Sequence, residues 1–208
     1  MSENLLIVFV KNAKLGHVKT RLAQTIGSEA ALTIYKELIR TTQKATKQTQ
    51  AEVHIYFSET VETSNWSASK LAIQHGSDLG ARMRHAFLDS FDQGYKRVVL
   101  IGSDLPDITS AIINQAFDYL QTSEAVIGPA EDGGYYLIGL SKMQTTIFED
   151  MPWSESDLFQ KTVDLLWQHQ ISFETLETLN DIDTFEDLEA SHFYQSNPDL
   201  QQKIKVLL

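Results

Sequence analysis

Three segments of the sequence combine residues that could bind a phosphate group or a divalent metal. The first, residues 11–21, reads KNAKLGHVKTR and carries three lysines, one arginine and one glycine. Phosphate oxygens are bound by cationic side chains and by backbone N–H groups that can approach them closely. The segment contains neither a Walker A sequence nor a dinucleotide GxGxxG. It therefore indicates a phosphate-binding loop or, alternatively, a plain basic turn.

The second segment is GSDLPD at residues 102–107, in which Asp104 follows directly on an apolar run. A carboxylate at the end of a buried strand loses hydration, and binding a divalent cation compensates for that loss. Mg2+, or Mn2+ in its place, fits because magnesium prefers one or two protein carboxylates together with phosphate oxygens and water. The alternative is that Asp104 caps the next helix or turn. We predict that Asp104 binds the metal.

The third segment, GPAEDGGYY at residues 128–136, places two consecutive glycines, Gly133 and Gly134, beside two acids and two tyrosines. Such a turn lets a ligand approach the backbone, and its aromatic rings could flank a sugar or another acceptor. An ordinary Asp-Gly-Gly hairpin turn is the alternative, and it is compatible with a site. Asp132 is the better candidate for a functional carboxylate, since its glycine neighbours leave it accessible.

Two further segments hold weaker candidates. In NDIDT at residues 180–184, Asp183 and Thr184 are more typical of helix caps, and a metal role for Asp183 requires that Asp104 lie nearby. The segment QHGSDLGARM at residues 74–83 could offer backbone donors to a nucleobase or phosphate, or it could simply begin a capped helix.

The elements that must position these segments follow from the periodicity of the apolar residues. It predicts strands over residues 5–10, 53–57, 70–74, 97–101, 125–127 and 135–140, the last two as a possible hairpin, and helices from Ser28 to the polar stretch 43–50, over 78–91 and over 109–120. This alternation predicts an α/β fold with three layers, α/β/α, around a mostly parallel, doubly wound Rossmann-like sheet. Ligands of such sheets bind at the carboxyl ends of the strands, where all three main segments fall.

The composition limits the remaining possibilities. A chain of 208 residues without a long linker predicts a single domain, residues 1–208. The net charge of −11 disfavours nucleic acid as a partner, and the absence of cysteine excludes disulfides, thiolate metal sites and cysteine nucleophiles. No apolar run approaches the roughly 20 residues of a membrane span, and no basic segment precedes the first apolar run. We expect a soluble, cytoplasmic protein.

Six short motifs, taken in order, resemble a known bacterial family. They are VKTRLA (18–23), DLGARM (78–83), LIGSDLP (100–106), IGPAEDGGYYLIGL (127–140), PWSESD (152–157) and DIDTFEDL (181–188). They resemble the uncharacterised GT-A-type glycosyltransferase family called domain of unknown function 2064, within the nucleotide-diphospho-sugar transferase superfamily. That superfamily includes the molybdopterin-guanine dinucleotide and phospholactate guanylyltransferases, which bind an NTP and magnesium. The family usually has a proline in the first loop, where this chain reads KNAKLG.

The resemblance implies a role for each matching residue. The nucleotide and its phosphates are expected to contact Lys11, Gly16, Lys19, Arg21, Leu79, Gly80 and Ser103. The metal ligands are expected to be Asp104 and Asp183. The acceptor is expected to contact Asp132, Gly133, Gly134, Tyr135 and Trp153. Catalysis is expected to depend on Asp104, Asp132 and Lys19.

We therefore expect a metal-dependent transferase that uses a nucleotide-sugar donor and a small-molecule acceptor. The metal, Lys19 and Arg21 would neutralise a diphosphate while the acceptor attacks the sugar C1. One alternative is a nucleotidyltransferase, in which the acceptor attacks the α-phosphorus of an NTP and pyrophosphate leaves. Others are a non-catalytic nucleotide-binding protein and a metal-dependent hydrolase of a nucleotide-sugar.

Overall fold

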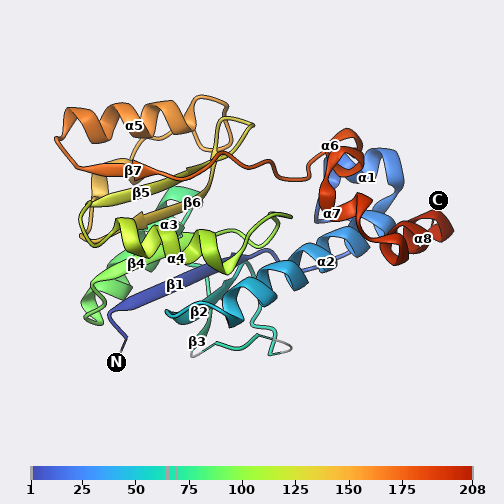
Figure 1. Ribbon diagram of the computed structural model, residues 1–208, viewed down its shortest axis with the longest axis horizontal. Helices are drawn as coiled ribbons and strands as arrows, with labels where there is room; N and C mark the ends of the chain where they lie inside the picture. Colours follow the sequence, from blue (N-terminus) through green and yellow to red (C-terminus); the bar gives the residue numbers. More distant parts are fainter. Residues whose placement is uncertain (1, 64–65, 69, 208) are drawn as a thin grey trace.

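A seven-stranded sheet lies at the centre of the protein and carries helices on both faces (Figure 1). The computed structural model describes residues 2–63, 66–68 and 70–207. The strands are β1 (Asn4–Val10), β2 (Glu52–Phe57), β3 (Lys70–Ile73), β4 (Arg97–Ile101), β5 (Ala125–Pro129), β6 (Tyr135–Leu140) and β7 (Phe173–Thr175). The helices are α1 (Thr20–Ile26), α2 (Ser28–Lys47), α3 (Leu79–Asp92), α4 (Ser110–Tyr119), α5 (Leu158–Gln168), α6 (Phe185–Ala190), α7 (His192–Gln195) and α8 (Pro198–Leu207), with a 3-10 turn at Thr145–Phe148.

The strand order β3-β2-β1-β4-β6-β5-β7 determines where a ligand can bind. Strand β1 pairs in parallel with both β2 and β4, whereas β6 runs antiparallel to both of its neighbours, β4 and β5. The order therefore reverses between β1 and β4. In open α/β sheets the crevice at such a reversal, outside the carboxyl ends of the strands, is where ligands bind. The loops that follow β1 and β4 are those that contain residues 11–21 and Asp104.

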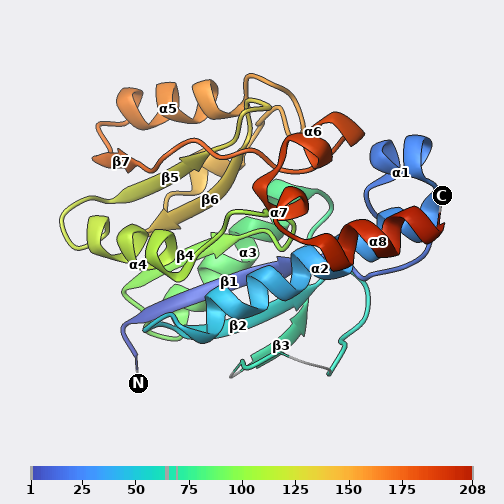
Figure 2. The ribbon, with the colours of Figure 1, turned by 45° about the vertical axis from the view of Figure 1, so that its right-hand side comes forward.

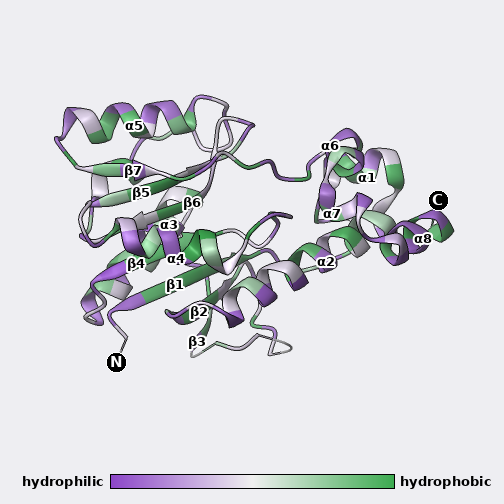
Figure 3. Cartoon of the chain, viewed as in Figure 1, coloured by the Kyte–Doolittle hydropathy of each residue, from purple (hydrophilic) through white to green (hydrophobic). Residues whose placement is uncertain are grey.

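Strand β1 shows why these apolar runs become central strands. Successive side chains of a strand point to opposite faces. Leu6 and Val8 enter a core shared with α2 and α4, while Leu5 and Ile7 enter a second core shared with α3 and α5. All four side chains are fully buried, and each such burial contributes roughly 1.5–3 kcal/mol. Figure 3 shows the strands as the most hydrophobic part of the ribbon.

A third apolar cluster joins helices from both ends of the chain. Leu22 and Ile26 of α1 pack with Ile34 of α2, Leu188 of α6 and Ile204 of α8. Helix α8 packs against α2 (Figure 2). Because Ile182 is also buried in this cluster, the segment around residues 180–184 returns to the loop after β1.

The sequence predicted every strand from β1 to β6, and the expected hairpin of β5 and β6 is confirmed. Helix α2 runs further than expected, to Lys47, because Ala45 and Thr46 continue its buried face through the polar stretch. Helices α1, α5, α7 and α8 and strand β7 were not predicted. Among the described residues, no helix has the length and apolarity needed to span a membrane.

Candidate nucleotide and metal site

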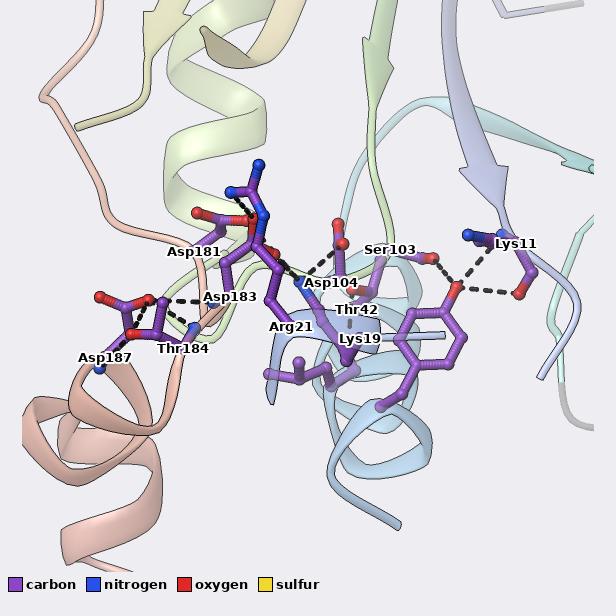
Figure 4. A network of polar contacts seen from close by, with 12 residues as sticks. Lys11, Lys19, Arg21, Thr42, Ser103, Asp104, Asp181, Asp183, Thr184 and Asp187 are labelled. Carbon is purple, nitrogen blue, oxygen red and sulfur yellow. Dashed lines mark hydrogen bonds and ion pairs between the residues drawn. The ribbon is translucent and has the colours of Figure 1, made fainter. Parts of the chain in front are cut away.

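The ammonium group of Lys19 lies among three carboxylates at the carboxyl ends of β1 and β4 (Figure 4). Its Nζ atom is 3.0 Å from Asp104, 3.2 Å from Asp183 and 3.6 Å from Asp181. Only 4% of the Lys19 side chain is exposed, whereas 44% of Asp104 and 39% of Asp183 remain accessible. Lys19 therefore pairs with the carboxylates from inside the fold, while Asp104 and Asp183 still face solvent on their other side.

The backbone around Lys19 directs its side chain inward. Lys19 is the residue before α1 and has a left-handed conformation with φ 45° and ψ 51°. Its carbonyl oxygen accepts a hydrogen bond from the N–H of Ala23, while Leu22 and Ile26 anchor α1 in the helical cluster. A left-handed residue other than glycine costs about 1–3 kcal/mol and persists only where its surroundings compensate. The three ion pairs of Lys19 provide that compensation.

The charges of this cluster shift two pKa values. Burial lowers the pKa of Lys19, but Asp104, Asp181 and Asp183 together raise it well above its ordinary value. Burial raises the pKa of Asp181, Lys19 lowers it, and the neighbouring carboxylates Asp183 and Asp104 raise it, to a net value of about 6. Lys19 is therefore charged at neutral pH, and the carboxylates repel one another around it.

Neither Asp104 nor Asp183 caps a helix. Thr109 caps α4, since its hydroxyl accepts a hydrogen bond from the N–H of Ile112. Thr184 caps α6 in a capping box with Asp187. Asp104 is therefore not a helix cap, and of Asp183 and Thr184, the two candidates for the cap of α6, only Thr184 is one. The condition for a metal role of Asp183, that Asp104 lie nearby, is met.

Asp181 was not among the predicted site residues. The alternation of polar and apolar residues could have indicated it. Asp181 and Asp183 flank Ile182, which is 1% exposed and points into the helical cluster. In an extended segment, residues on either side of a buried one project to the opposite face together.

Lys11 and Lys14 of the basic segment 11–21 contact other residues than the three carboxylates. The Lys14 ammonium pairs with Glu59, and the Lys11 backbone exchanges hydrogen bonds with the Tyr35 hydroxyl. That hydroxyl also lies 3.2 Å from the hydroxyl of Ser103, which is buried. Ser103 and Tyr35 thus tie the loop after β1 to the loop after β4.

The predicted residues Gly16 and Arg21 lie at the surface. Gly16 has φ 76°, and a Cβ atom added there would meet nothing within 4 Å, so its backbone is open to a ligand. Arg21 has 76% of its side chain exposed and reaches one oxygen of Asp183 at 3.5 Å. Its remaining N–H donors are therefore available to an incoming phosphate.

The carboxylates fit a hard divalent cation. Mg2+ and Mn2+ prefer oxygen donors, and Mg2+ commonly needs only one or two carboxylates when phosphate oxygens and water complete its coordination. Asp104 and Asp183 both pair with the Lys19 ammonium group, and both keep accessible oxygens. Over the described part of the chain, no group of three or more His, Cys, Asp or Glu side chains is arranged to hold a metal by itself. The donor set thus suits a metal that arrives with a phosphate ligand.

A cleft with two connected parts opens beside the carboxylates. The outer part has a volume of about 220 Å³ and includes Asp104, Asp132, Glu155 and Asp181 in its lining. The inner part has a volume of about 150 Å³, and its lining is mainly apolar. The lining shared by both parts consists of Leu79, Gly102, Tyr135, Tyr136 and Leu158.

Two glycines allow the walls of this cleft to approach each other. A Cβ atom on Gly80 would lie 2.5 Å from the ring of Trp153, and one on Gly133 would lie 1.8 Å from the carbonyl oxygen of Ser156. The motifs at residues 78–83, 128–136 and 152–157 therefore meet here. Leu79 and Gly80, expected at the nucleotide, lie on the same side as the expected acceptor residues. Asp132 lines the outer part, and its Oδ1 accepts a hydrogen bond from the N–H of Gly134.

Comparison with known proteins gives a family and a fold. Residues 41–155 match the family described as "Uncharacterized protein conserved in bacteria (DUF2064)". The crystal structure of a "putative nucleotide-diphospho-sugar transferase" from Desulfovibrio desulfuricans G20 is 34% identical, with a TM-score of 0.86 over 98% of this chain and 99% of that chain. None of the curated proteins matches the chain.

More distant structures share the fold alone. The inositol-1-phosphate CTP transferase from T. maritima is 12% identical, with a TM-score of 0.59 over 97% of this chain and 96% of that one. Rv0371C from Mycobacterium tuberculosis H37Rv, in complex with manganese, is 14% identical, with a TM-score of 0.52 over 91% of this chain and 97% of that one. The predicted three-layer nucleotide-diphospho-sugar transferase fold is confirmed.

Proposed function

Since the chain belongs to the bacterial domain of unknown function 2064 family, we propose that it is a metal-dependent transferase that moves a sugar from a nucleotide-diphospho-sugar to a hydroxyl acceptor. One observation carries the proposal: Asp104, Asp181 and Asp183 converge on Lys19 at the reversal of strand order, and the cleft begins at Asp104. The fold of the close relative supports a nucleotide-sugar as donor.

In this mechanism the residues around Lys19 bind the diphosphate and those of the cleft direct the acceptor. Arg21 donates hydrogen bonds to phosphate oxygens, and Lys19 keeps the carboxylates in place. The Asp132 carboxylate takes the proton of the acceptor hydroxyl as its oxygen attacks C1 of the sugar. The bond from C1 to the diphosphate oxygen breaks, and its electron pair leaves with the nucleoside diphosphate. Positioning and charge stabilisation provide the acceleration.

A divalent metal bound by Asp104 and Asp183 would neutralise negative charge on the leaving diphosphate. The manganese complex of a protein that shares the fold is consistent with this ligand type. Asp181 would strengthen the negative potential at the metal without serving as a ligand.

The lining of the cleft favours a hydroxyl acceptor over a phosphate acceptor. The name of the T. maritima enzyme shows that its acceptor carries a phosphate, and a phosphate is usually bound by lysine or arginine. Among the described residues that line either part of this cleft, there is no lysine or arginine, whereas the outer part contains four acids. Nucleotidyl transfer to a phosphate acceptor is therefore the second candidate.

We also propose that residues 1–208 act as one cytoplasmic domain. Helix α2 contributes Ala45 to the core on the sheet and Ile34 to the helical cluster, so the two would be expected to unfold together. Two separate unfolding transitions in calorimetry would contradict this.

The experiment that tests the function measures thermal stabilisation by NTPs and nucleotide-sugars, each with and without Mg2+ or Mn2+. A nucleotide at 100 times its dissociation constant stabilises the native state by about 2.7 kcal/mol. We expect a nucleotide-sugar to stabilise the wild type only in the presence of metal, and Asp104→Asn to abolish the effect. Asp107→Asn is the matched control, because Asp107 is exposed and makes no ion pair among the described residues.

The product identifies the reaction. Release of a nucleoside diphosphate that requires an acceptor supports glycosyl transfer, and release of pyrophosphate from an NTP supports the second candidate. Release of the sugar into water alone would indicate a hydrolase. If no nucleotide stabilises the protein in a metal-dependent way, or if Asp104→Asn and Asp107→Asn behave alike, the proposed function is wrong.

A further inference from the structure

The inner part of the cleft has the size and surface of a site for one ring. Its walls include Phe9, Met83, Trp153 and Leu158, and its volume is about 150 Å³. In proteins, an apolar cavity of about this volume accepts a benzene ring. A sugar would be a poor occupant, since its hydroxyl groups would lose water without gaining hydrogen-bond partners. The outer part, with its carboxylate acceptors, suits a sugar better.

One polar atom in this apolar region lacks a partner. Tyr135 lines both parts of the cleft, and its hydroxyl oxygen is buried without a hydrogen bond to any described residue. Its neighbour Tyr136 differs, because that hydroxyl donates to the carbonyl oxygen of Glu177. Buried polar groups are nearly always hydrogen-bonded, and leaving one unpaired lowers the stability of the folded state. Because this oxygen has almost no accessible surface, a ligand in the inner part reaches it once the Tyr135 ring turns toward the cleft that it lines.

The charge around the cleft restricts what can enter it. Asp104, Asp132, Glu155 and Asp181 line its outer part. Asp132 and Glu155 make no ion pair with any described residue, so no side chain neutralises them. Bringing like charges together at an interface weakens binding. An acceptor that carries a phosphate or a carboxylate would therefore be repelled, while a neutral or cationic one would not.

We propose that the inner part of the cleft is the acceptor subsite and that it binds a neutral or cationic small molecule with a single aromatic or aliphatic ring and one hydrogen-bonding group. The ring lies against Trp153, and the one polar group points to the outer part of the cleft, where it pairs with the Tyr135 hydroxyl and also faces Asp132. The assignment rests on the proposed function, because this group is then the hydroxyl that receives the sugar. It goes further in naming the chemical class of the acceptor.

The first test compares three probes of one shape and different charge: benzyl alcohol, benzylamine and benzyl phosphate. Dissociation constants are measured by saturation-transfer NMR with the full chain, without nucleotide or metal. We expect benzyl alcohol and benzylamine to bind, and benzyl phosphate to bind about tenfold more weakly or not at all. Trp153→Ala should abolish binding. Trp167→Ala is the matched control, because Trp167 is 71% exposed and lines neither part of the cleft.

A second variant removes only the unpaired hydroxyl. Tyr135→Phe should bind benzyl alcohol roughly fivefold more weakly, the loss expected for one hydrogen bond. Without any probe the same variant should unfold at a temperature about 2–4 °C higher, since it no longer buries an unpaired polar group. Tyr119→Phe is the control, because the Tyr119 hydroxyl already accepts a hydrogen bond from Gln115. That variant should gain no stability and bind the probes normally.

Two results would overturn the subsite. One is binding of benzyl phosphate as tight as that of benzyl alcohol; the other is unchanged probe affinity in both Trp153→Ala and Tyr135→Phe. Because the probes are measured without nucleotide, the outcome is independent of the proposed function. A protein that binds nucleotide through Asp104 but none of the probes refutes the subsite alone.

Discussion

The Nζ atom of Lys19 lies 3.0 Å from a carboxylate oxygen of Asp104, and the two residues follow β1 and β4, the strands between which the sheet order reverses. With Asp181 and Asp183 on its other sides, the ammonium group stands where a cation is needed to hold three carboxylates together. A divalent metal at Asp104 and Asp183 would share these carboxylates with Lys19 or displace its ammonium from them.

Replacing Lys19 should therefore reveal competition between the lysine and the metal. Lys19→Met leaves the carboxylates without their internal cation and should lower the free energy of unfolding by about 2 kcal/mol, less than for a fully buried pair because the acids are partly exposed. Mn2+ should stabilise this variant more than the wild type. Urea unfolding with and without Mn2+ measures both effects.

The control for that experiment is Lys14→Met, which breaks the exposed pair between Lys14 and Glu59. It should change neither the stability nor the response to Mn2+ appreciably. Equal behaviour of Lys14→Met and Lys19→Met would contradict competition between Lys19 and the metal for the three carboxylates.

Arg21 should contribute to nucleotide binding without contributing to stability. Its side chain is 76% exposed, and among the described residues it forms an ion pair with Asp183 alone, at 3.5 Å. Arg21→Ala should weaken binding of a nucleotide-sugar about tenfold, the value of one charge-assisted contact. Calorimetric titration measures the affinity. Arg40→Ala, which removes an exposed arginine paired with Glu37 on α2, should leave it unchanged.

The two adjacent glycines of the β5–β6 turn should respond differently to substitution. Gly133 has φ 89°, and an added Cβ atom would lie 1.8 Å from the Ser156 carbonyl oxygen. Gly133→Ala should therefore lower the free energy of unfolding by about 3 kcal/mol or more. At Gly134 the nearest atom to an added Cβ is Asp132 Oδ1 at 3.2 Å, and Gly134→Ala should cost about 1 kcal/mol or less. Similar losses in both would contradict the tight packing at Ser156.

Glu124 should make the stability of the β5 end of the sheet depend on pH. Its hydrogen bond with Lys142 lowers its pKa, burial raises it, and the Ser172 backbone N–H lowers it, for a net decrease from 4.5. A lowered pKa in the folded state contributes stability that is present above pH 4.5 and is lost as the pH falls through the lowered value.

Urea unfolding should be measured for the wild type and Glu124→Gln at several pH values between 7 and 3. At pH 7 the free energy of unfolding of the wild type should be higher by up to about 1 kcal/mol, and at pH 3 this difference should disappear. Glu174→Gln is the matched control, since Glu174 is exposed on β7 and has no ion pair among the described residues. A difference that persists at pH 3 would show that the effect is not electrostatic.

Local patterns predicted much of the fold and part of the site. The apolar run at residues 5–10 and the helical spacing after Ser28 correctly predicted β1 and α2. The burial of a strand, or of one face of a helix, determines the spacing of apolar residues within a single segment. The same patterns missed α1, whose seven residues form a helix mainly because they pack against α2 and α6. A short helix has little stability of its own.

The sequence by itself determined which carboxylates and cations stand at strand ends, and motifs spread over nearly the whole chain identified the family. Only the tertiary structure decided that Lys19 lies inside a ring of Asp104, Asp181 and Asp183, and that Gly80 lies against Trp153. These contacts join segments far apart in the chain, and their geometry depends on the strand order and on how the last helices pack. Neither property is recorded in the spacing of neighbouring residues.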